Sequence, residues 1–72
     1  MNKELIEAYE RELHRYTNLK KVSVIHIKLY GVDMMESEYY TNVDEIARFD
    51  EQIEWLEYQL EGLNEEGMKS ND

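Results

Sequence analysis

The last third of the sequence carries an apolar repeat that leaves it few possible folds. Large apolar residues recur there at alternating intervals of three and four positions. This spacing places them on one stripe of an α-helix, and such a stripe is removed from water by packing against another element. The stripe consists of Ile46, Phe49, Ile53, Leu56, Leu60 and Leu63. We therefore expect a packed helix in which Ile53, Leu56 and Leu60 are buried at a contact between helices or subunits.

Polar residues indicate where this helix begins and ends. Asn42 is a suitable N-cap, because Glu45 three positions later allows the reciprocal hydrogen bonds of a capping box. Thr41 would serve nearly as well. Gly67 is a suitable stop, so the helix is expected over about residues 42 to 65. The whole chain is expected to form one helical domain over residues 1–66, followed by a disordered tail over 67–72.

The N-terminal part repeats the same spacing and predicts an amphipathic helix from about residue 2 to 18. Its stripe consists of Ile6, Tyr9, Leu13 and Tyr16. Lys20 falls where the next apolar residue is due. A shift of four residues, as in a coiled-coil stutter, restores the stripe as Leu19, Val22, His26 and Leu29. The first helix is therefore expected to continue to about residue 30.

Residues 21–30 also fit a β-strand, because their many Val and Ile residues allow an alternating face. In that alternative, Gly31 turns the chain into a second strand over residues 35–41, which gives an α-β-β-α domain. The second strand would be short and polar, and a two-stranded hairpin is marginal unless a helix covers it. We therefore expect an all-α antiparallel hairpin with helices over 2–30 and 42–65 and a loop over 31–41.

Charge is divided unequally between the two halves of this chain of 72 residues, whose net charge is -9. Residues 1–30 contain four acidic and six basic residues, whereas residues 31–72 contain thirteen acidic and two basic residues. Basic residues of the first helix are therefore expected along acidic residues of the second. A lone hairpin of this size leaves much of its apolar stripe exposed to water, so we expect a homodimer that forms an antiparallel four-helix bundle.

Several classes of site are disfavoured by the sequence. The chain has no cysteine for a disulfide or a thiolate metal site, no apolar run near ~18 residues, and no secretory signal at its N-terminus, so a cytoplasmic location is expected. On one helix, His14 and His26 would lie about 18 Å apart and could not share a metal. No nucleophile, phosphate loop or calcium loop is recognisable. We expect no enzyme activity, cofactor or metal.

Acidic residues of the second helix form the best candidate site. Five of them recur at intervals of four, three, four and four, so they share one face: Asp50, Glu54, Glu57, Glu61 and Glu65. Their spacing of about 5–6 Å is similar to that of successive phosphates along a nucleic-acid strand. This face is either a solvated helix surface or an imitation of a phosphate backbone that fits a basic groove. Direct nucleic-acid binding is disfavoured by the negative net charge.

Trp55 and Tyr58 lie beside the apolar stripe of the second helix. They either complete the edge of the core or form an aromatic patch that binds a partner. Together with the five acidic residues, they make up the expected partner-binding set.

The segment Tyr16-Thr17-Asn18-Leu19-Lys20, followed by spaced apolar residues, resembles the N-terminal helices of small phage proteins from Gram-positive hosts. Some of those proteins resemble late-operon transcription regulators. The resemblance implies a phage or mobile-element origin and an interaction role. This chain departs from such regulators because it has no C-terminal helix-turn-helix, which puts DNA binding in doubt.

These observations lead to one functional hypothesis and one alternative. The hypothesis is a small acidic interaction module that inhibits or regulates a host protein that handles nucleic acid, by occupying a basic surface of that protein. The alternative is a structural coiled-coil adaptor or oligomerisation module without inhibitory activity. Loss of binding when the acidic charges are removed would favour the first, and sensitivity at Trp55 or Tyr58 would favour the second.

Overall fold

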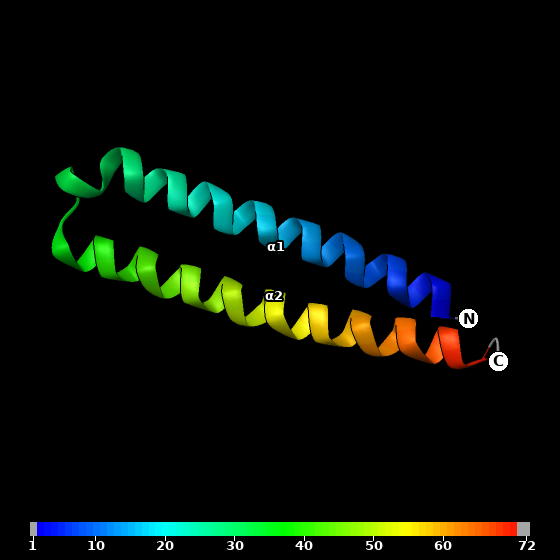
Figure 1. Ribbon diagram of the computed structural model, residues 1–72. Helices are drawn as coiled ribbons and strands as arrows, with labels where there is room; N and C mark the ends of the chain where they lie inside the picture. Colours follow the sequence, from blue (N-terminus) through cyan, green and yellow to red (C-terminus); the bar gives the residue numbers. More distant parts are fainter. Residues whose placement is uncertain (1, 71–72) are drawn as a thin grey trace.

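Two long helices account for nearly all of the chain that the computed structural model describes, which is residues 2–70, with side chains described over 2–65. Helix α1 spans Asn2–Tyr30, the short 3₁₀ helix η1 spans Gly31–Asp33, and α2 spans Glu36–Ser70. The helices run antiparallel and side by side, so that α1 begins where α2 ends (Figure 1). The molecule is a rod of 57 × 14 × 14 Å. The expected all-α hairpin is confirmed.

Residues 21–30 belong to α1, and no strand occurs in residues 2–70. The α-β-β-α alternative is therefore wrong. Val and Ile lower helix propensity only slightly, whereas extending an existing helix adds one hydrogen bond per residue and needs no new nucleation. The low helix propensity of the many β-branched residues in this segment is therefore too small an effect to end α1.

The stripe of α1 that faces α2 keeps its spacing without a shift. After Tyr16, the half-buried residues include Lys20, Ser23 and Ile27, which continue the original repeat. The residues of the expected stutter are instead exposed: Leu19, Val22, His26 and Leu29. The stutter is therefore wrong, and Lys20 occupies a stripe position.

Lys20 is accommodated in the stripe by an ion pair with α2. Its Nζ lies 2.6 Å from Oδ1 of Asp50, and both side chains remain about half exposed. A lysine in this place covers apolar surface with its methylene stem while its ammonium group reaches the edge of the interface. Here a basic residue of the first helix does lie along an acidic residue of the second, as the charge distribution predicts.

Helix α2 is longer than expected at both ends. It begins at Glu36 rather than near residue 42. Between η1 and α2 the backbone is extended at Met34, and it becomes helical again almost at once. The expected loop over 31–41 is therefore wrong beyond residue 35. At the other end α2 continues through Gly67 to Ser70, so Gly67 is not the stop. Residues 71 and 72 of the expected tail lie outside the described residues.

Asn42 and Thr41 lie inside α2 and do not cap it. The Asn42 amide donates a hydrogen bond to the carbonyl oxygen of Glu38 at 2.8 Å, and the Thr41 hydroxyl donates one to Ser37 at 2.8 Å. Each bond runs back by one helical turn, as polar side chains do within a helix. The expected N-cap is therefore wrong.

Replacing Asn42 with alanine tests whether this residue lies inside α2 or at its N-cap, because the two locations predict opposite changes in the free energy of unfolding. Inside a helix, alanine has the higher propensity, so Asn42→Ala should raise the free energy of unfolding by about 0.5 kcal/mol. At an N-cap the same change would lower it by about 0.5–2 kcal/mol. Urea denaturation followed by circular dichroism measures the difference, and a clear loss of stability would contradict the position of Asn42 inside α2.

The core of the hairpin is small and lies in the half of the rod away from η1. Leu56 and Leu60 are only 3% and 8% exposed, which confirms their expected burial, whereas Ile53 is half-buried. Aromatic pairs between the helices extend this core. The Tyr9 and Trp55 rings meet edge to face with centroids 5.7 Å apart, and those of Tyr16 and Phe49 are 6.2 Å apart.

Candidate functional site

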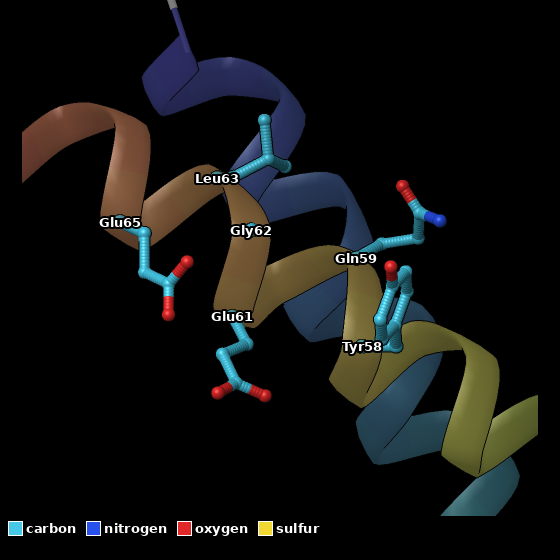
Figure 2. Close-up of a pocket in the computed structure, with 6 residues that line it drawn as sticks. All are labelled: Tyr58, Gln59, Glu61, Gly62, Leu63 and Glu65. Carbon is cyan, nitrogen blue, oxygen red and sulfur yellow. The ribbon is translucent and has the colours of Figure 1, made fainter.

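The acidic residues of α2 lie as the helical spacing predicts. Glu54, Glu57, Glu61 and Glu65 are exposed, and we call these four residues the acidic face. Figure 2 shows the carboxylates of Glu61 and Glu65 pointing to the same side of α2. The α-helix has one turn per 3.6 residues, which brings carboxylates three or four positions apart to one side.

Asp50 differs from the other acidic residues of its stripe. It is half-buried, and Lys20 neutralises its charge. Within residues 2–65, the other ion pair joins Arg15 to Glu12 within α1 at 2.8 Å. Glu54, Glu57 and Glu61 therefore have no basic side chain within ion-pair distance among the described residues, whereas Asp50 is paired.

A groove between the two helices runs beside the acidic face. Leu13 of α1 and Leu60 of α2 belong to the apolar stripes and form its floor. Glu57, Glu61 and Glu65 line it on the α2 side together with Asn64. An apolar floor with carboxylates along one rim suits a lysine or arginine side chain, because its methylene stem covers the floor while its charged head pairs with the rim.

The two aromatic residues of the predicted set are not equivalent. Trp55 packs against Tyr9, so about half of its surface already serves the contact between the helices. Tyr58 is 72% exposed and lines a shallow hollow around Gly62, together with Glu61 and Glu65 (Figure 2). The hollow exists because Gly62 has no side chain, and nothing lies within 4 Å of where a Cβ would be. The structure thus joins Tyr58, but not Trp55, to the acidic face.

Leu13 is the part of the groove that the sequence analysis missed. It was identified as a stripe residue of the first helix, but its position opposite Glu57 and Glu61 depends on the register between the helices. In that register Lys20 pairs with Asp50, and the sequence alone does not single out this pair among the many opposite charges of the two helices.

Several polar side chains of α1 contact one another within the helix. His14 lies 3.2 Å from the Asn18 amide nitrogen, and Arg15 donates two hydrogen bonds to the Glu12 carboxylate. These bonds, and the charge of Glu12, raise the pKa of Arg15. Among the described residues, no three His, Cys, Asp or Glu side chains gather closely enough to hold a metal ion.

Two further findings bear on the site. Neither helix, over the residues described, has an apolar stretch long enough to cross a membrane. Comparison with protein families, curated proteins and solved structures finds no match to this chain. The acidic face and the groove beside it are thus the features from which a function can be inferred.

Proposed function

We propose that the hairpin is a small acidic interaction module that binds a basic surface of another protein. The observation that carries this proposal is the groove with Leu13 and Leu60 as its floor and Glu57, Glu61 and Glu65 along its rim. Basic side chains of the partner enter the groove and pair with the carboxylates. Desolvation at the apolar floor strengthens these ion pairs relative to pairs on a flat, fully solvated surface.

The partner we propose is a protein that handles nucleic acid, which the module inhibits or regulates. Carboxylates three and four residues apart on α2 are spaced similarly to successive phosphates, so a groove that follows a phosphate backbone also fits the acidic face. The negative net charge of the chain directs it to a basic protein surface. The resemblance to small phage proteins supports a phage or mobile-element origin and an interaction role. The module acts as a homodimer with a four-helix core.

A structural adaptor is the second candidate function, and the exposure of Tyr58 favours it. A large aromatic side chain that is 72% exposed on α2 suits an apolar contact with a partner. In an adaptor, the partner contact would depend on Tyr58 and not on the glutamates.

Affinity capture followed by competition tests the proposed function. The full chain is immobilised and incubated with lysate of its native host, and the captured protein is then purified and titrated. We expect a basic protein whose binding is displaced by double-stranded DNA, because both ligands occupy the same groove. A partner that binds the hairpin and DNA at the same time would contradict the proposal.

A further inference from the structure

Gly62 occupies a position in α2 where the fold of this chain gives no reason for a glycine. After proline, glycine is the residue least suited to the interior of a helix. It is usually required by a positive φ angle or by a segment that passes too close for a side chain. The φ angle of Gly62 is not positive, and nothing lies within 4 Å of the place that a Cβ would take. The space that the missing side chain leaves is therefore open to another molecule.

The hollow at Gly62 has an exposed aromatic wall. Tyr58 lies one helical turn before Gly62 and is 72% exposed, so most of its surface is free to contact a partner. The other described residues that line the hollow are Gln59, Glu61, Leu63 and Glu65 (Figure 2). Its volume of about 380 Å³ is enough for one side chain of a partner. All of these residues belong to α2, so the hollow does not depend on the register between the helices.

The hollow shares two carboxylates with the groove of the proposed function. Glu61 and Glu65 line the groove that has Leu13 and Leu60 as its floor, and they also line the hollow. These two glutamates therefore lie between the groove and the hollow, and we call them the acidic ridge. Glu61 has no basic side chain within ion-pair distance among the described residues. Its charge is available to a cation in either depression.

An exposed aromatic ring beside such a carboxylate suits an arginine better than a lysine. A guanidinium group is planar, stacks on the face of an aromatic ring and pairs with a carboxylate through parallel hydrogen bonds. An ammonium group has the same charge, but it is more strongly hydrated and has no flat face. Tyr58 and Glu61 are three positions apart on α2, so their side chains are neighbours. One guanidinium group above Gly62 can therefore contact both.

We propose that the hollow at Gly62 holds the guanidinium group of an arginine of the partner, stacked on Tyr58 and paired with Glu61. This inference rests on the proposed function and adds a second basic side chain to the one in the groove. The partner then contacts the acidic ridge from both sides. Any side chain at position 62 would occupy the place of the guanidinium group, so glycine suits the site despite its low helix propensity.

Nuclear magnetic resonance with small probes tests the occupant of the hollow. The probes are the N-acetyl amides of arginine, lysine, leucine and citrulline, which resembles arginine in shape but has no charge. Arginine amide should shift the signals of the Gly62 amide and the Tyr58 ring until they saturate, lysine amide should bind about threefold more weakly, and citrulline amide should cause no shift. Equal shifts with citrulline amide, or shifts with leucine amide alone, would overturn the proposal.

Gly62→Leu separates this role from the fold, because its effects on binding and on stability have opposite signs. Leucine has a much higher helix propensity than glycine, so the thermal midpoint should rise by about 3–6 °C. The leucine side chain fills the hollow, so the affinity for arginine amide should fall at least about tenfold. The matched control is Gln52→Leu, at an exposed position of α2 outside the hollow, and it should leave this affinity unchanged. Undiminished binding by Gly62→Leu would contradict the proposal.

Variants of Tyr58 and Glu57 distinguish this inference from the proposed function. Tyr58→Phe keeps the ring and should preserve the affinity for arginine amide, whereas Tyr58→Leu removes it and should weaken binding about threefold. If arginine amide shifts the signals of Leu13 and Leu60 but not those of Gly62, the groove binds a cation and the inference is wrong. Glu57 lines the groove but not the hollow. If Gly62 responds to arginine amide while Glu57→Gln binds the captured partner normally, the hollow stands and the proposed groove contact is wrong.

Discussion

Leu56→Ala should lower the free energy of unfolding by about 2–5 kcal/mol, the usual cost of emptying a leucine site in a core. Leu56 is the most deeply buried residue of the described chain, with 3% of its surface exposed, and only Leu60 is buried to a similar degree. A domain of this size has a total stability of roughly 5 kcal/mol, so the variant should be largely unfolded at room temperature. Thermal and urea denaturation at one fixed protein concentration measure the loss, since the proposed dimerisation would make stability depend on concentration.

Tyr58→Ala is the control for this substitution. It removes a larger side chain from the same helix, but one that is 72% exposed, so the free energy of unfolding should change by no more than about 0.5 kcal/mol. Similar losses in the two variants would mean that Leu56 does not lie at the contact between α1 and α2.

The second large effect is expected on partner binding. Glu54→Gln/Glu57→Gln/Glu61→Gln removes three charges from the acidic face while keeping side-chain size and helix propensity. Each charged contact of the acidic face contributes about 1 kcal/mol, so affinity for the captured partner should fall roughly 100-fold. Isothermal titration calorimetry measures the affinity, and circular dichroism should show an unchanged helix content.

A second triple variant separates the position of the charges from their number. Asp44→Asn/Glu45→Gln/Glu51→Gln changes the net charge by the same amount on the same helix, and all three residues are exposed outside the acidic face. Its affinity for the partner should fall less than tenfold, because only long-range attraction is weakened. If both triple variants lose affinity equally, the partner responds to net charge and the groove has no specific role.

Much of the fold could be predicted from the sequence because the spacing of apolar residues indicates which face of each helix packs. The stripe from Ile46 to Leu63 and the shorter stripe from Ile6 to Tyr16 each required a helix, and two stripes in one small chain required that they face one another. The acidic face followed from the same periodicity, since its carboxylates lie on one side of the helix that the apolar stripe defines.

Lys20 and Asn42 show where such reasoning stops. Each is a polar residue at a stripe position, and sequence alone treats it as a signal that the pattern shifts or a helix begins. In the structure, Lys20 is stabilised by Asp50 from the other helix, and Asn42 bonds to the carbonyl oxygen of Glu38 in its own helix. The first solution depends on a partner whose position is known only once the register of the hairpin is known. The second depends on α2 beginning before residue 42.

The groove was not predictable because it, too, depends on the register between the helices. Leu13 and Leu60 come from different helices, and their place between the glutamates follows from how far α1 is displaced along α2. The exposure of Val22 and Leu29 also contradicts their identity as stripe residues. It shows that an apolar pattern predicts burial, but does not say whether the same chain or a second copy provides the covering surface.

The dependence of partner affinity on salt is the most direct test that the acidic face binds a basic surface. Dissociation constants of the wild-type protein and the glutamine triple variant are measured with the captured partner between 50 and 500 mM salt, where the screening length falls from about 14 to 4 Å. We predict that wild-type affinity falls tenfold or more across this range, and that the variant binds weakly with a much flatter dependence. A wild-type affinity that is independent of salt and matched by the variant would contradict the proposed function.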